Sequence, residues 1–138
     1  LEKGHLIPGA DTDALGNPYE AGVGFAIRDE KEDFIGKAFL ADFKQRKIEN
    51  KLIPFRLQEG DPIPKDGVAV IENGKPVGRI TSSRISPTLG YGIGMAWVPI
   101  ESANVGNHFN IRFLDGTNVM ATVLDHAAYD PGGSRLKS

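Results

Sequence analysis

From residue 51 onward the sequence alternates short apolar-rich runs with residues that form tight turns. The clearest turn is Asn73-Gly74, because this pair readily adopts the two positive φ angles of a type I′ hairpin. Asp115-Gly116-Thr117 marks a second hairpin. The predicted strands are residues 51–58, 68–71, 76–80, 91–98, 108–114 and 118–124. Such a series of short strands favours a small, closed or nearly closed antiparallel β-barrel, because closure removes unpaired strand edges.

The first 50 residues predict a different kind of structure. Residues 1–24 are rich in turn formers and show no hydrophobic period, which indicates an irregular segment with a short strand near residues 22–27. An apolar stripe then predicts a helix over residues 34–47, with Asp33 as its N-cap. We therefore expect an α+β, mainly β fold. It comprises a loop-helix segment (1–50) too small to fold alone, the barrel (51–129) and a surface tail (130–138).

Composition argues against several classes of function. The 138 residues include no cysteine, so disulfides, thiolate metal sites and cysteine nucleophiles are excluded. His5, His108 and His126 show no paired ligand spacing, and we expect no metal site. A net charge of −2 argues against a general nucleic-acid binder. No apolar run reaches the roughly 20 residues of a membrane span, and no signal peptide is visible.

Two short patterns have a structural interpretation that is simpler than a functional one. Gly90, Gly92 and Gly94 lack the spacing of a phosphate-binding loop, and alternating glycines within a strand more often allow close packing. Asp11 and Asp13 lack the other ligands of a calcium loop. Bonding of these side chains to the backbone of a turn is the favoured interpretation.

A hydroxyl-rich stretch follows the first hairpin. Its members are Thr81, Ser82, Ser83 and Ser86. No nucleophile motif surrounds them, so we interpret the stretch as a polar turn before Pro87. Arg79 and Arg84 flank it and have the paired donors to hold a carboxylate or phosphate, although a solvated strand end is the simpler interpretation. Trp97 lies on an apolar strand and is predicted to be part of the core.

Five motifs, taken in order, resemble the second half of the glycine cleavage T-protein (aminomethyltransferase) family. They are residues 1–5 (Leu-Glu-Lys-Gly-His), 9–13 (Gly-Ala-Asp-Thr-Asp), 18–22 (Pro-Tyr-Glu-Ala-Gly), 33–37 (Asp-Phe-Ile-Gly-Lys) and 81–90 (Thr-Ser-Ser followed by Ser-Pro-Thr-Leu-Gly). The same module ends the sarcosine oxidase, sarcosine dehydrogenase and dimethylglycine dehydrogenase chains. The Glu-Lys-Gly-His motif and Tyr129-Asp130-Pro131 resemble those relatives more closely.

This resemblance implies a role in binding tetrahydrofolate. The family binds this cofactor in the central hole of three domains, the last of which is a β-barrel, so residues 1–50 would be a remnant of the central folate-binding domain. Glu2 would grip the pterin ring, and Lys31 would be the basic residue that helps to hold the folate. The family often has arginine at the position of Lys31, and lysine cannot form a bidentate fork. Tyr129 and Arg135 are the candidate folate contacts in the tail.

The resemblance also sets expectations for activity and partners. The chain begins with Leu1, and the family's catalytic aspartate lies in an N-terminal part that has no match here. We therefore expect this chain to be a fragment or subunit that does not catalyse aminomethyl transfer alone. Its expected partner is the N-terminal half of the same protein or a separate subunit. A lipoyl carrier protein is a further expected partner. An uncovered docking face would favour a homodimer. The family context implies the cytoplasm, or the mitochondrial matrix in a eukaryote.

Two alternatives remain open at this point. Instead of an aminomethyltransferase fragment, the chain would be a folate-binding module of a flavin-dependent sarcosine or dimethylglycine oxidising enzyme, or a non-catalytic barrel used for subunit contact. A dinucleotide-binding fingerprint upstream would favour the first alternative. The second predicts no folate affinity and a stable interface with a partner chain.

Overall fold

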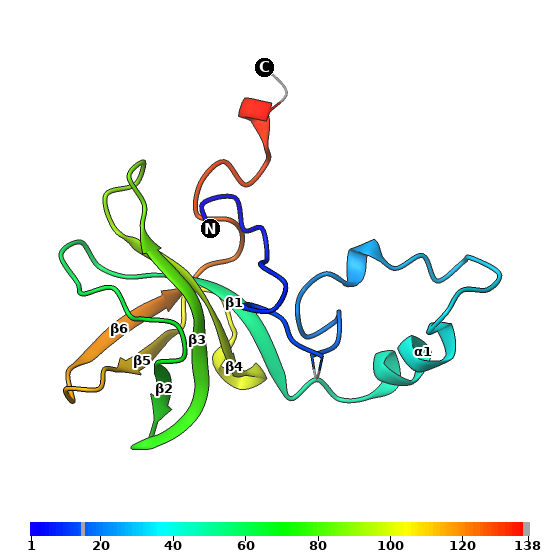
Figure 1. The fold of residues 1–138 in the computed structure, drawn as a ribbon, viewed down its shortest axis with the longest axis horizontal. Coiled ribbons are helices and arrows are strands. Elements are labelled where there is room, and N and C mark those ends of the chain that lie inside the picture. The colour runs from blue at the N-terminus through cyan, green and yellow to red at the C-terminus, as the bar shows by residue number, and fades with distance from the viewer. Residues whose placement is uncertain (15, 137–138) are drawn as a thin grey trace.

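The structure, a computed structural model, describes residues 1–14 and 16–136, and within them six antiparallel strands close into a barrel (Figure 1). The strands are β1 (Asn50–Arg56), β2 (Ala69–Glu72), β3 (Lys75–Ile85), β4 (Gly92–Pro99), β5 (His108–Arg112) and β6 (Asn118–Val123). Their order around the barrel is β1-β4-β3-β2-β5-β6. The predicted fold class, α+β and mainly β with a small antiparallel barrel, is confirmed.

Both predicted hairpin turns form. Asn73 and Gly74 join β2 to β3 with φ angles of 50° and 77°, the two positive values that the sequence predicts. The turn between β5 and β6 contains Gly116 at φ 88°. There the backbone N–H of Thr117 donates to Oδ1 of Asp115 at 2.9 Å. These local signals set the register of the two hairpins.

Alternate residues of the strands fill the barrel interior. In β5, Phe109 and Ile111 are buried between exposed neighbours, as expected for a strand with one face on a core. The rings of Phe55 and Phe109 meet edge-on, with centroids 5.6 Å apart. A Cβ atom at Gly94 would lie 2.5 Å from Phe55 Cζ and 2.5 Å from the carbonyl oxygen of Ser82. Close packing therefore accounts for this glycine, as predicted.

Strand β4 is buried on both of its faces. Ala96 and Val98 point into the barrel, whereas Met95 and Trp97 belong to a second apolar cluster on the outer surface. Leu1, Leu6, Ala21 and Val23 cover that cluster from outside. Trp97 is buried, as predicted, but its place in this outer cluster depends on the N-terminal segment, which we define as residues 1–14.

Three of the four residues of the hydroxyl-rich stretch lie in a strand and not in the predicted polar turn, whereas Ser86 lies in the turn that follows. Strand β3 continues to Ile85, and Thr81, Ser82 and Ser83 within it are buried. The interpretation as a turn is wrong for these three residues because hydroxyl side chains can occupy a buried strand when each one finds a hydrogen-bond partner. The hydroxyl of Ser83, for example, donates to the carbonyl oxygen of Pro64.

The predicted helix is shorter than expected, and the predicted strand near residues 22–27 does not form. Helix α1 spans Lys37–Gln45, and a 3₁₀ turn, η1 (Gly24–Ala26), occupies the place of the strand. Gly36, and not Asp33, is the N-cap, with φ 92°. A left-handed residue cannot continue an α-helix, so the helix starts after it. Two further 3₁₀ turns are η2 (Ile100–Ser102) and η3 (Ser134–Leu136).

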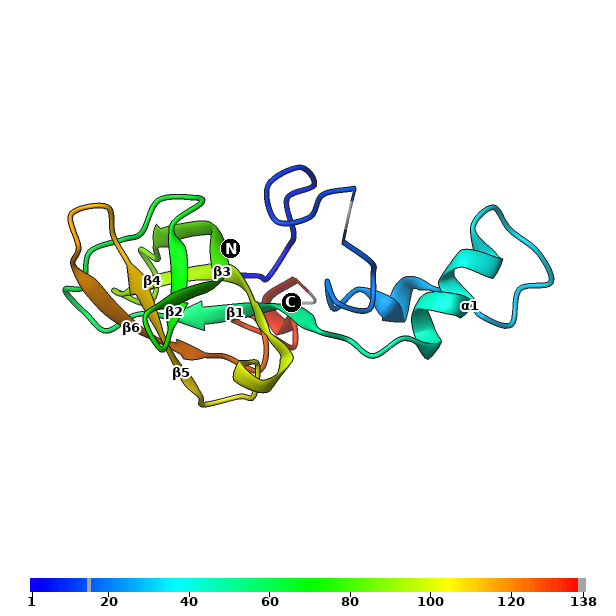
Figure 2. The same cartoon turned by 90° about the horizontal axis from the view of Figure 1, so that it is seen from below.

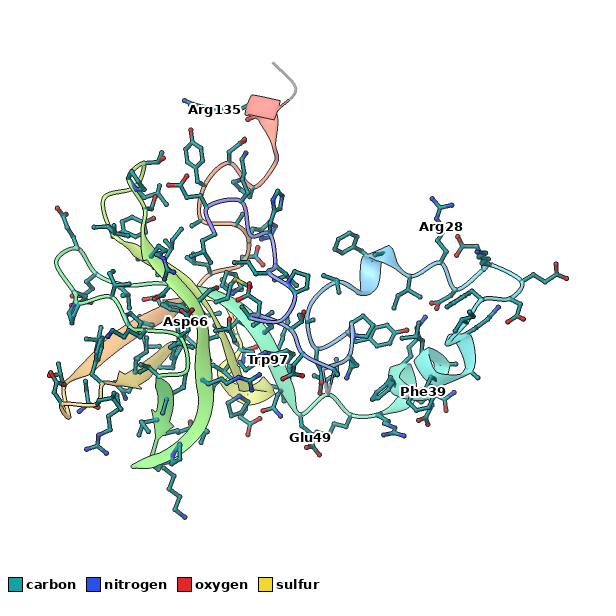
Figure 3. The ribbon with its side chains drawn as sticks, viewed as in Figure 1. Arg28, Phe39, Glu49, Asp66, Trp97 and Arg135 are labelled. Carbon is teal, nitrogen blue, oxygen red and sulfur yellow. The ribbon has the colours of Figure 1, made fainter. Side chains whose placement is uncertain are left out.

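Residues 24–49, which we call the lobe, extend away from the barrel and carry η1 and α1 (Figure 2). Helix α1 contains no buried residue, and Phe39 on it is 69% exposed. Figure 3 shows Phe39 on the lobe, far from Trp97 at the barrel. The N-terminal segment and the C-terminal tail lie beside the barrel on another side (Figure 1). No helix in the described part of the chain has the length and apolarity that a bilayer crossing requires.

Candidate functional site

Glu2 is held in place by the loop that follows β3. Its Oε1 atom accepts a hydrogen bond from the hydroxyl of Ser86, 84 residues away in the sequence. The same hydroxyl oxygen accepts the backbone N–H of Leu89 at 3.0 Å. Because Leu89 supplies a donor to this hydroxyl, the Ser86 proton is directed to the carboxylate. Ser86 itself is buried, so this contact is fixed by the barrel.

These contacts favour the charged form of Glu2. The hydrogen bond from Ser86 is the largest influence and lowers the pKa of the Glu2 carboxyl from its usual value, and donors on Thr88 lower it further. Partial desolvation opposes this change without reversing it. Glu2 is therefore a carboxylate at neutral pH. A carboxylate has acceptor capacity for more than one donor, so it is able to bind a second group besides Ser86.

A pocket of about 540 Å³ opens beside Glu2. Small-molecule sites commonly occupy about 300–1,000 Å³. Its apolar walls come from Leu1, Ile7, Ala10, Ile85, Pro87 and Ile93. Its polar walls come from Glu2, Lys3, His5, Asp66, Ser82, Arg84 and Ser86. The N-terminal segment and the end of β3 thus both line one cavity that has apolar and polar walls.

The C-terminal tail docks directly on the Glu2 region. The backbone N–H of Tyr129 donates to the carbonyl oxygen of Glu2 at 3.0 Å. Lys3 forms an ion pair with Asp130. The hydrogen bond from Lys3, together with donors from Ser134, holds the pKa of the Asp130 carboxyl well below its usual range. The two ends of the described chain are therefore joined at the side of the candidate site.

Tyr129 lies between two cations. The Nζ atom of Lys3 lies 5.8 Å from the centre of the Tyr129 ring, and the guanidinium carbon of Arg135 lies 5.5 Å from it. Both distances are within the range of cation–π attraction. Arg135 marks the tail in Figure 3. The structure thus brings three predicted folate contacts, Glu2, Tyr129 and Arg135, to one corner of the molecule.

Lys31 is not brought to this corner. It lies exposed in the lobe, in the loop between η1 and α1, where its carbonyl oxygen accepts a hydrogen bond from the side chain of Lys37. The loop between η1 and α1 lies at the far end of the lobe from the N-terminal segment in both views (Figures 1 and 2). The role of Lys31 in binding folate stays a prediction.

Sequence reasoning did not identify the residues that support Glu2. Ser86 belongs to the hydroxyl-rich stretch, but its hydrogen bond to Glu2, 84 residues away, has no local signal in the sequence. Asp11 does make the predicted turn contact, since Oδ2 accepts the backbone N–H of Ile7 at 2.8 Å. It is also completely buried and bonded to β3, which the prediction of a simple turn missed. Asp13 behaves as predicted, accepting the backbone N–H of Gly16 at 3.1 Å.

Comparisons with known proteins agree with this architecture. A family model for the "Glycine cleavage T-protein C-terminal barrel domain" matches residues 50–130. An aminomethyltransferase of Halothermothrix orenii is 40% identical over 111 residues, which cover 80% of this chain and 31% of that protein. An aminomethyltransferase of Thermotoga maritima is 38% identical over 129 residues, covering 94% of this chain and 34% of that protein.

A solved structure has the same fold. The glycine cleavage system aminomethyltransferase T from Bartonella henselae superposes with a TM-score of 0.86, at 19% sequence identity, over 94% of this chain and 37% of that chain. The chain therefore spans about a third of the length of these relatives. The match of the family model and the identity to the relatives show that this chain belongs to the glycine cleavage T-protein (aminomethyltransferase) family and contains its C-terminal barrel domain.

Proposed function

We propose that this chain provides part of the tetrahydrofolate site of an aminomethyltransferase and that Glu2 is its pterin-binding residue. The observation that carries the proposal is the charged Glu2 carboxylate, oriented by Ser86 at the edge of a pocket of about 540 Å³. Membership of the aminomethyltransferase family supports the choice of folate over other flat ligands with a polar edge.

The residues present fit such a ligand. The amino-pyrimidinone edge of a pterin presents neighbouring N–H donors, and a carboxylate accepts two parallel hydrogen bonds as it does from guanidinium. Ile7, Ile85 and Pro87 line the same pocket and offer apolar contact to the ring faces. When bound, tetrahydrofolate supplies the nitrogen that accepts the one-carbon unit. The residues of this chain would bind and orient that cofactor.

The complete transfer reaction is proposed for a larger protein. Because the chain covers about a third of its relatives, we expect the remaining walls of the pocket and the catalytic aspartate to come from the part of an aminomethyltransferase that it does not match. A protein carrying a lipoyl arm is the expected donor partner. The exposed apolar side chains of the lobe, Phe25, Ile35 and Phe39, would pack against such a remainder or, in isolation, against a second copy.

A second candidate function rests on the resemblance of two motifs to the flavin-dependent sarcosine and dimethylglycine enzymes. The two motifs contact each other, since Lys3 pairs with Asp130 and the backbone N–H of Tyr129 donates to the carbonyl oxygen of Glu2. In such an enzyme the same pocket would bind folate that traps the one-carbon unit released by amine oxidation. Both candidates therefore share the folate site and differ in the donor of the carbon.

Calorimetric titration of tetrahydrofolate tests the proposal. We expect the Glu2→Gln variant to bind at least about tenfold more weakly than the unaltered chain, equivalent to about 1.4 kcal/mol. Glu59→Gln, a matched change at an exposed position, should bind like the unaltered chain. Equal affinity of the chain and of Glu2→Gln would contradict the role of Glu2. No binding, even after addition of the unmatched part of a relative such as the Thermotoga maritima protein, would leave the barrel as a subunit-contact module.

A further inference from the structure

Asp11 is the one buried carboxylate among the described residues, with no exposed surface. Burial of a charged group is unfavourable unless hydrogen bonds replace its lost hydration. Its Oδ1 atom accepts the hydroxyls of Thr81 at 2.6 Å and Ser82 at 2.7 Å, and its Oδ2 atom accepts the backbone N–H of Ile7 at 2.8 Å. All three of these donors are uncharged groups, and two of them come from neighbouring residues of β3.

A bulge in β3 creates this arrangement. Ile80 pairs with Ala96 and Ser82 pairs with Met95, so Thr81 is an extra residue in the register, although its hydroxyl also lies 3.2 Å from the carbonyl oxygen of Met95 on β4. In a regular strand, neighbouring side chains point to opposite faces of the sheet. A bulge changes the direction of one side chain, which allows the adjacent hydroxyls of Thr81 and Ser82 to reach the same oxygen of Asp11.

Two of the three acidic residues of the N-terminal segment, Glu2 and Asp11, are fixed to the same part of the barrel. Asp11 is bonded to β3, and Glu2 is bonded to Ser86 just after β3 ends. Between them the segment supplies Ile7 and Ala10 to the Glu2 pocket. Asp11 does not line that pocket, but Ser82, which it holds, does.

We infer that Asp11 is a positioning residue for Glu2. It fixes the far end of the N-terminal segment to the bulge in β3, so that Glu2 and the pocket wall keep their places relative to Ser86. The effect of Asp11 on the affinity for tetrahydrofolate rests on the proposed function. The effect of Asp11 on the position of Glu2 does not, and it can be tested without any ligand.

The primary variant is Asp11→Asn, which keeps the size of the side chain but cannot accept a bond at each of its two terminal atoms. Asp13→Asn is the matched control, because Asp13 lies two residues away at the surface, where it pairs with Arg79. If Asp11→Asn does not fold, Thr81→Val replaces it, since it removes one donor to Asp11 from a residue outside the pocket.

The first readout is the titration midpoint of Glu2, followed by the NMR signal of its side-chain carboxyl carbon. We expect the midpoint to move upward toward the usual value in Asp11→Asn, because a displaced Glu2 loses the hydrogen bond from Ser86. Asp13→Asn should leave the midpoint unchanged. A folded Asp11→Asn or Thr81→Val variant with an unchanged Glu2 midpoint would overturn the inference.

The second readout is a double-mutant cycle on tetrahydrofolate affinity. We expect Asp11→Asn to weaken binding about tenfold in the unaltered chain but less than about twofold in Glu2→Gln, because the effect passes through Glu2. Equal weakening in both backgrounds would show that Asp11 acts independently of Glu2 and would overturn the inference. If tetrahydrofolate does not bind even after addition of the unmatched part of a relative, the proposed function fails, while the Glu2 titration still decides the inference.

Discussion

The indole N–H of Trp97 donates a hydrogen bond to the main-chain carbonyl of Asp11 at 2.9 Å. Trp97 lies on the outer face of β4, and Asp11 lies in the N-terminal segment, so the bond joins the barrel to the segment that carries Glu2. Figure 3 shows Trp97 where that segment crosses the barrel. The Asp11 residue is thus held through both its side chain and its backbone.

Loss of this bond should destabilise the chain by a modest amount. Trp97→Phe keeps an aromatic ring in the outer cluster but leaves the Asp11 carbonyl without its donor, so we expect the free energy of unfolding to fall by about 1–3 kcal/mol. The free energy of unfolding is measured by urea unfolding followed by circular dichroism. Tryptophan fluorescence cannot be used for the variant, because the substitution removes the single tryptophan. An unchanged unfolding midpoint would show that water replaces the indole without loss.

Gly94 should not tolerate even a methyl group. A Cβ atom there would approach both Phe55 and the backbone of Ser82 to 2.5 Å. We expect Gly94→Ala to lower the free energy of unfolding by about 1–3 kcal/mol or more through overpacking. Gly132→Ala is the control, because nothing lies within 4 Å of the added atom. Equal stability of the two variants would contradict the close packing of β4 on β1.

The ion pair between Lys3 and Asp130 should make stability depend on pH. The pKa of Asp130 is held below its usual value of 3.8, so its contribution is complete above that pH and is lost as the pH falls below it. We expect the free energy of unfolding to decrease less steeply between about pH 4.5 and pH 2 in Asp130→Asn than in the unaltered chain. Asp42→Asn, at an exposed pair on α1, is the control.

The unaltered chain, Asp130→Asn and Asp42→Asn are compared by measuring the free energy of unfolding of each as the pH is lowered. If the decrease in stability were the same with and without the Asp130 carboxylate, the tail would not be held by this pair in solution. The docking of Tyr129 on Glu2 would then depend on the backbone hydrogen bond alone.

The exposed lobe should make the isolated chain self-associate. Phe25 is 87%, Ile35 105% and Phe39 69% exposed, and several large apolar side chains exposed on one segment favour association. We expect light scattering to give a mass that rises with concentration and Phe39→Glu to reduce it to that of a monomer. Leu114→Glu, an equally apolar position in the turn between β5 and β6, should have no effect. A monomer at every dilution would contradict this expectation.

Local signals predicted the barrel because its hairpins are local structures. Asn73-Gly74 fixes a turn through backbone angles that these two residues adopt readily, and the alternation around Phe109 and Ile111 separates core from solvent. The motif around Glu2 was recognisable from its resemblance to a family. Neither inference needed contacts between distant residues.

Distant contacts explain what the sequence did not predict. Thr81 and Ser82 resemble a polar turn until the buried Asp11, 70 and 71 residues away, supplies their acceptor. Propensity and spacing cannot include a partner that only the fold brings near.

The predicted helix was too long for a local reason. Gly36 takes a left-handed conformation, so the helix begins after it.

An NMR titration of the isotope-labelled chain with tetrahydrofolate tests whether the pocket beside Glu2 is the folate site. We expect the largest chemical-shift changes at the amides of Lys3, His5 and Ser86, which line the pocket beside Glu2. Glu2→Gln should weaken these changes, whereas Glu59→Gln should not. Shift changes confined to the lobe around Lys31, or to the β5–β6 turn, would contradict the claim that the Glu2 pocket is the folate site.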